Sequence, residues 1–154
     1  RIKIMILNIG KKDYNIEFNI EASLNTECVD QITEFVCGLG GAENKNPIQS
    51  ILDSVKDKPK TVLAMFYAGL LEHHGEDGDS TVMSKADAKR LLKQYFSEHK
   101  EDGAGNYYAL YTLLLGQMED DGFFALIGLE QTMNDITEFV KKIKEAQTKN
   151  KSKK

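Results

Sequence analysis

The stretch AMFYAGLLEHHGEDGDSTVMSKADAKRLL, Ala64–Leu92, contains an apolar helical pattern followed by two adjacent histidines and an acidic loop. Between residues 62 and 71, apolar side chains recur at helical spacing: Val62, Leu63, Phe66, Tyr67, Leu70 and Leu71. A stripe this broad is typical of a helix that is buried on more than one side. We therefore predict a central core helix that begins at Pro59 and ends at the two histidines.

His73 and His74 stand at the predicted end of this helix, and Gly75 follows them. Adjacent helical residues point about 100° apart, so the pair cannot share a metal ion as histidines at i and i+4 do. Histidines in a last turn are favoured by the helix dipole and can bond the free carbonyls, and glycine commonly follows a helix end. We expect the pair to cap the helix.

The acidic loop beginning at Asp77 has the first residues of a calcium-binding loop but not the rest. Val82 occupies the position that requires glycine, and Ala88 occupies the position of the bidentate glutamate. No metal site or cofactor is therefore expected here. Ser84 with Asp87 three residues later predicts a helix N-cap, and apolar spacing continues that helix to His99.

Two segments near the start of the chain are rich in β-forming residues. Ile2–Ile9 and Tyr14–Ile20 carry isoleucines and aromatics and are separated by Gly10–Asp13, which predicts a β-hairpin. A two-stranded hairpin is marginally stable alone, so it must pack on helices or pair with the edge of another chain.

Helical periodicity accounts for most of the remaining chain. Helices are predicted at Thr26–Leu39, from Pro47 to Val55, in the two segments described above, and at Tyr107–Met118. The fold class is therefore α+β, mainly α, with an N-terminal β-hairpin followed by about five or six helices. At 154 residues the chain suits one domain, which we assign to residues 1–140.

The last helical pattern has the most regular spacing. Its apolar residues recur at steps of three and four: Leu126, Leu129, Met133, Ile136, Val140 and Ile143. This spacing is typical of the seam along which one helix packs against another. The partner helix is either internal or in another molecule, so the seam is a candidate partner-binding surface.

Charge is distributed unevenly along the sequence. The net charge is -4, but residues 141–154 hold seven lysines and one acidic residue, so residues 1–140 carry about -10. Such an acidic body repels phosphate backbones and argues against nucleic-acid binding as the main activity. The lysine-rich tail is expected to be a frayed, solubilising C-terminus, although contact with nucleic acid or an acidic partner is the alternative.

Other motifs give little support to an enzyme. Cys28 and Cys37 lie about 13 Å apart on one predicted helix, too far to pair, and are expected to be buried free thiols. The glycines of residues 38–41 follow a helix and lack the Lys-Ser/Thr ending of a phosphate-binding loop. The longest apolar run, Thr61–Leu71, is too short to span a membrane, and no signal-peptide pattern is present. We expect a soluble cytoplasmic protein.

The layout resembles the tail assembly chaperones of long-tailed phages and prophages. The resemblance covers roughly Ile2 to Phe96 and rests on the opening hairpin, on LAMFYAGLLEHH at Leu63–His74 and on SKADAKRLL at Ser84–Leu92. It implies a non-enzymatic protein of the bacterial host cytoplasm that coats the tape measure protein, recruits tail tube subunits and leaves the finished particle. The candidate surfaces for this role are the seam and the hairpin edge, each of which could instead pack internally.

A second interpretation belongs to a different functional class. The same seam could build a homo-oligomer, and the chain would then be a self-associating structural or accessory component of a phage tail or head. A structural component stays in the assembled particle, whereas a chaperone does not.

Overall fold

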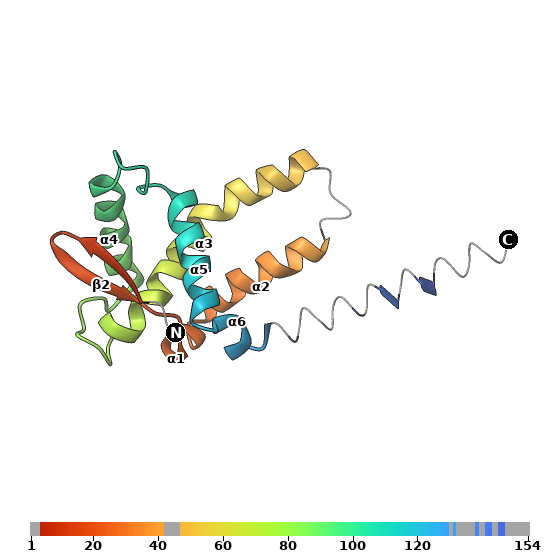
Figure 1. The fold of residues 1–154 in the computed structure, drawn as a ribbon, viewed down its shortest axis with the longest axis horizontal. Coiled ribbons are helices and arrows are strands. Elements are labelled where there is room, and N and C mark those ends of the chain that lie inside the picture. Colours follow the sequence, from red (N-terminus) through yellow and green to blue (C-terminus); the bar gives the residue numbers. More distant parts are fainter. Residues whose placement is uncertain are drawn as a thin grey trace.

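A computed structural model describes residues 4–41 and 47–129, together with the isolated positions 131, 138, 141–142 and 145–146. The strands are β1 (Met5–Ile9) and β2 (Lys12–Ile16). The helices are α1 (Ile20–Ser23), α2 (Thr26–Gly41), α3 (Pro47–His74), α4 (Lys85–Glu98), α5 (Tyr107–Asp120) and α6 (Phe123–Leu126). The predicted fold class, mainly α with an N-terminal hairpin, is confirmed (Figure 1). The assignment of the tail to residues 141–154 falls mostly outside the described residues.

β1 and β2 form an antiparallel hairpin around a two-residue turn. Gly10 and Lys11 both have positive φ, 61° and 68°, as a turn that matches the twist of a hairpin requires. The predicted four-residue connection was therefore too long, because Lys12 already pairs with Ile9. Leu7, Ile9, Tyr14 and Ile16 are buried on one face, whereas Ile4 and Ile6 are exposed on the other.

The second strand ends earlier than the sequence predicts. After Ile16 the backbone bonds to α3 and to the corner between α5 and α6. The Glu17 N–H donates to the Gly69 carbonyl at 3.0 Å, and the Phe18 N–H donates to Asp121 Oδ2 at 2.9 Å. Ile20, predicted as strand, instead begins α1. Tertiary hydrogen bonds thus override the β propensity of these residues.

α3 is the central element, contacting β2, α1, α2, α4 and α5. The sequence predicts two helices here with a boundary at Pro59, but α3 runs without interruption through Pro59. Proline has a φ that suits a helix and removes one hydrogen bond, so a helix can continue when packing offsets that loss. The turns after Pro59 supply this packing, since Val62, Met65, Phe66 and Leu70 are fully buried.

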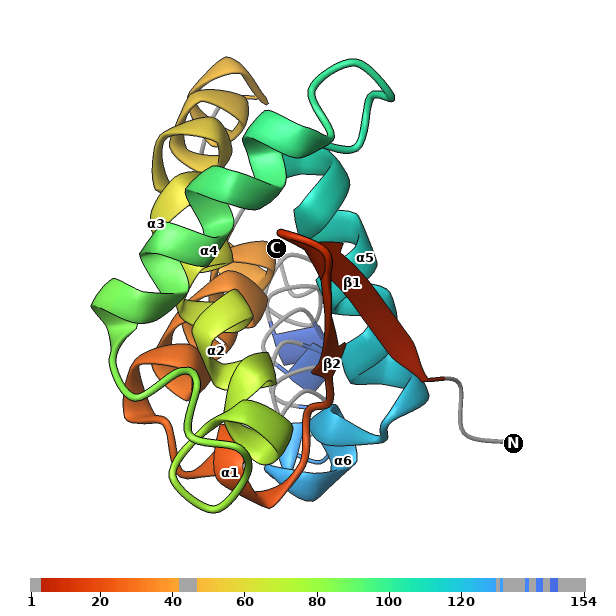
Figure 2. The same ribbon diagram turned by 90° about the vertical axis from the view of Figure 1, so that its left-hand side faces the viewer.

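Helices α1, α2, α4 and α5 pack against α3, and the hairpin lies against α3 and α4. Figure 2 shows β2 on the side of the hairpin nearer α3 and β1 on the outer side. The largest buried side chains come from the strands, α2, α3, α5 and α6, and include Ile9, Ile16, Ile32, Phe66, Leu114 and Phe123. Among the helices of the described residues, none has both the length and the apolarity needed to cross a membrane.

α4 and α5 begin at side-chain caps. Ser84 accepts a hydrogen bond from the Asp87 N–H, which confirms the predicted N-cap of α4. Asn106 caps α5 in the same way by accepting from the Ala109 N–H at 2.9 Å. These bonds satisfy N–H groups that a helix start leaves free.

Candidate functional site

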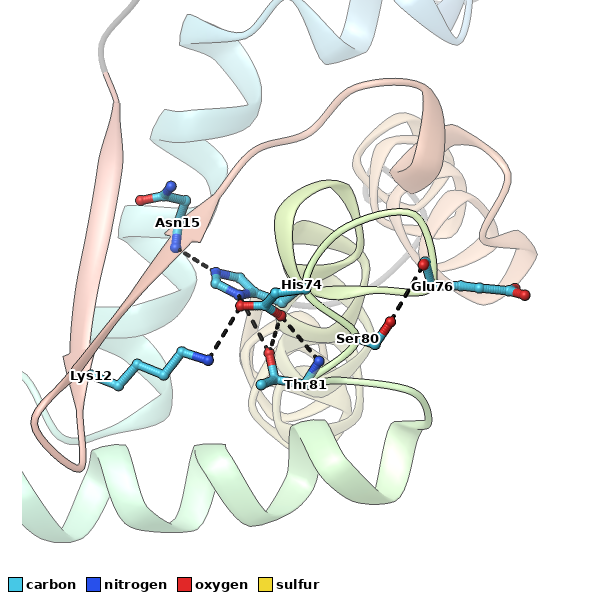
Figure 3. A network of polar contacts seen from close by, with 7 residues as sticks. Lys12, Asn15, His74, Glu76, Ser80 and Thr81 are labelled. Carbon is cyan, nitrogen blue, oxygen red and sulfur yellow. Dashed lines mark hydrogen bonds and ion pairs between the residues drawn. The ribbon is translucent and has the colours of Figure 1, made fainter.

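His74 is the buried centre of a polar cluster that joins three segments of the chain (Figure 3). Its Nε2 accepts a 2.9 Å hydrogen bond from the backbone N–H of Asn15 in β2. Its Nδ1 lies 3.0 Å from Asp79 Oδ2, in the loop that follows α3. We call His74, Asn15, Asp79, Thr81 and Lys12 the His74 cluster.

These contacts fix the tautomer of His74. A backbone N–H can only donate, so Nε2 must present its lone pair and Nδ1 must carry the ring proton. Nδ1–H then donates to Asp79. Lys12 Nζ also contacts Asp79 Oδ2, at 3.2 Å, and the hydroxyl of Thr81 donates to the other carboxylate oxygen.

Asp79 remains ionised in this arrangement. The hydroxyl of Thr81 is the main cause of a pKa well below the usual aspartate range, and the Thr81 N–H, His74 and Lys12 lower the pKa further. A histidine with one nitrogen on a carboxylate is the arrangement that orients catalytic bases. In this protein, however, the Asn15 N–H occupies the nitrogen that a base would use. The cluster therefore holds β2 against the end of α3 and offers no free base.

The predicted capping role of the two histidines is wrong, although α3 does end at His74. The carbonyls of His73 and His74 accept hydrogen bonds from the backbone N–H groups of Asp79, at 3.1 Å, and Val82, at 2.8 Å. The rings are thus free to face β2, and His73 Nε2 lies 2.9 Å from Glu17 Oε1. The sequence could not reveal this, because the partners lie 56 and 59 positions away.

Acidic side chains gather near His73, where α1 approaches the end of α3. The pKa of Glu17 is lowered first by a hydrogen bond from Asn19 and then by His73. The pKa of Glu21 is raised, chiefly by a hydrogen bond with Asp77 and also by the charges of Glu72 and Glu76. Within the described part of the chain, no three acidic, histidine or cysteine side chains are placed to hold a metal ion.

The first two residues of the predicted seam, Leu126 and Leu129, do not lie on one continuous helix. Leu126 ends α6 and is 45% exposed, whereas Leu129 is 5% exposed. Between them, Gly128 has a φ of 76°, so one continuous helix does not pass through both leucines. Met133, Ile136, Val140 and Ile143 lie outside the described residues, and their role as a seam stays a prediction.

The outer edge of β1 is the second surface that the sequence points to. Because Ile9 and Lys12 close the hairpin, Ile6 and Asn8 direct their backbone groups away from β2. The Asn8 carbonyl lies 3.4 Å from His99 Nε2, and no hydrogen-bond partner for the Ile6 backbone occurs among the described residues. The opposite edge, on β2, is covered because Asn15 and Glu17 both donate to α3.

The side chains of β1 leave this edge uncharged. Met5–Ile9 reads MILNI and contains no charged residue. On its outer face Ile4 is 70% and Ile6 is 53% exposed. Edge strands are usually protected by charges or prolines, so an uncharged edge with exposed isoleucines is a surface suited to pairing with another strand. We call residues 4–8 the β1 edge. The alternation of apolar residues in the sequence could have predicted which isoleucines face outward.

Comparison of the chain with protein-family models, with curated proteins and with solved structures finds no match.

Proposed function

We propose that the protein is a non-enzymatic phage tail assembly chaperone that holds extended segments of the tape measure protein and helps to recruit tail tube subunits in the bacterial host cytoplasm. The observation that supports this role is the β1 edge, where the Ile6 backbone has no hydrogen-bond partner among the described residues and the Ile4 and Ile6 side chains are exposed. An extended partner segment would add a third strand, in which main-chain hydrogen bonds give affinity without demanding one sequence.

The size of the β1 edge fits transient binding. β1 is only five residues long, so an added strand gains few hydrogen bonds and buries a small area. Modest affinity is what a chaperone needs, because it must release its partner when the tail is built.

The test is co-expression with the tape measure protein from the same genome, followed by solubility measurement and pull-down. The edge variant carries Ile4→Lys and Ile6→Lys. Its matched control carries Leu24→Lys and Ile20→Lys, two aliphatic side chains that are likewise 70% and 53% exposed but lie at α1. We expect the wild type and the control to keep the tape measure protein soluble and bound, and the edge variant to lose both effects while its melting temperature is retained.

Two results would count against the proposal. If the edge variant and its control keep the tape measure protein equally soluble and bound, the β1 edge is not the binding surface. If the wild type does not keep the tape measure protein soluble, that protein is not the partner.

The same edge favours one alternative, a self-associating tail or head component. An uncharged strand can pair antiparallel with its own copy without like-charge repulsion. A stable homo-oligomer of the purified wild type that the edge variant lacks, together with recovery of the protein from finished particles, would favour this alternative.

A further inference from the structure

We propose that the His74 cluster is a pH-sensitive clasp: only neutral His74 can hold β2 against the end of α3, and proton uptake by its ring releases this part of the hairpin. The clasp is separate from the β1 edge and does not depend on any partner.

The hydrogen-bond pattern requires a neutral ring. Nε2 accepts from the Asn15 N–H at 2.9 Å, and Nδ1 is committed to Asp79 at 3.0 Å. A second ring proton would have to sit on Nε2, directly opposite the Asn15 N–H. Two donors would then face each other, and the hydrogen bond would be lost.

The surroundings of His74 combine opposing charges. Asp79 favours a positive ring, but Lys12 lies 3.2 Å from the same carboxylate oxygen and offsets its charge. The Tyr14 ring covers His74 at 4.9 Å between centroids, and the Thr81 hydroxyl lies 3.4 Å from Nδ1. The neighbouring His73 ring, at 6.5 Å, contacts Glu17. The side chain of His74 is only 6% exposed, so water cannot readily replace the lost Asn15 bond.

Glu17 supplies an internal reference for the clasp. Its N–H lies two positions after Asn15, just beyond the end of β2, and also donates to α3, but its acceptor is the Gly69 carbonyl at 3.0 Å, which does not titrate. Acid should therefore release Asn15 before Glu17.

The test is NMR of the intact wild-type protein. At pH 8, long-range proton–nitrogen spectra should show His74 protonated at Nδ1 and bare at Nε2. Between pH 8 and pH 5, the hydrogen-exchange protection of the Asn15 amide, corrected for the intrinsic pH dependence, should fall roughly tenfold relative to that of Glu17. In a His74→Gln variant, whose amide oxygen can accept the same bond without titrating, this relative fall should vanish.

Three outcomes would overturn the proposal. They are a proton on Nε2 at pH 8, an unchanged ratio of Asn15 to Glu17 protection on acidification, and the same fall in His74→Gln. If that variant does not fold, the two wild-type measurements still decide the question.

Discussion

The backbone N–H of Phe18 donates a 2.9 Å hydrogen bond to Oδ2 of Asp121, joining positions 103 residues apart. The other carboxylate oxygen of Asp121 accepts from Gln117 Nε2 at 2.8 Å. Phe18 is fully buried, and its ring lies 5.7 Å from that of Phe123 just beyond this contact. Asp121 therefore holds the segment between β2 and α1 against the corner between α5 and α6.

Replacing Asp121 should destabilise the fold much more than replacing its neighbour. Asp121→Ala leaves the Phe18 N–H without its acceptor in a partly buried place, which should lower the free energy of unfolding by about 1–3 kcal/mol. Asp120→Ala is the control, because Asp120 is exposed at the last residue of α5. Urea denaturation of both variants provides the measurement, and equal midpoints would contradict the role of Asp121.

Two helical glycines should respond to alanine in opposite directions. A Cβ at Gly69 would lie 2.7 Å from Ile16 Cγ2 and 2.9 Å from Phe18 Cζ, whereas a Cβ at Gly116 would meet no atom of the described residues within 4 Å. Gly69→Ala should therefore destabilise the protein by about 1–3 kcal/mol through overpacking. Gly116→Ala should stabilise it by about 0.5–1 kcal/mol through helix propensity. Thermal unfolding of the two variants tests this, and a shift of the same sign in both would refute it.

His99 should titrate above the ordinary histidine range. Its Nδ1 lies 2.8 Å from Asp102 Oδ2, and this hydrogen bond is the main cause of a raised pKa, with smaller effects from the Asn8 carbonyl and Glu98. Because the folded pKa is raised, the stabilising contribution is complete below about pH 6.5, the unfolded value, and is lost as pH rises through the folded value.

An NMR titration of the His99 ring, with Asp102→Asn compared with Glu101→Gln, measures this effect. The first variant should move the midpoint of His99 down, and the second should leave it nearly unchanged. A midpoint that is the same in all three proteins would exclude Asp102 as the cause. The stabilising contribution of His99 is lost as pH rises, whereas the proposed His74 clasp opens as pH falls. The two effects oppose each other in global stability, so each must be measured at its own site.

Cys28 should be unreactive in the folded protein. Burial is the first cause, and the charge of Glu27 the second, of a rise in its pKa to about 12. In a Cys37→Ser background, which leaves one thiol, labelling by a disulfide reagent at pH 8 should be roughly a thousandfold slower in the native than in the unfolded state. Rapid labelling without unfolding would show that the thiol is accessible.

Local signals account for the parts of the fold that the sequence predicted. The N-cap of α4 depends on Ser84 and Asp87, which are three positions apart. The hairpin depends on two β-forming segments separated by a turn that contains glycine. The misjudged features depend on distant residues. Pro59 stays within α3 because the following turns are buried. Ile20 leaves the strand pattern because Glu17 bonds to α3 and Phe18 bonds to Asp121, just after α5.

The features of the candidate sites also separate into those that depend on local sequence and those that depend on distant residues. The outward position of Ile6 follows from strand alternation, which is local, whereas the contact of His74 with Asn15 spans 59 positions and has no sequence signature. Periodicity alone also could not detect that Gly128 interrupts the helix between Leu126 and Leu129.

The hydrogen bond between Phe18 and Asp121 can form only late in translation, after the hairpin has been made. β1 and β2 leave the ribosome before every helix segment that holds them, and Asp121 follows Phe18 by 103 residues. At about 5–20 residues per second, the last of these contacts forms roughly 5–20 s after the hairpin emerges. A two-stranded hairpin is barely stable alone, so during this interval the uncharged β1 is exposed on the nascent chain to any strand it can pair with.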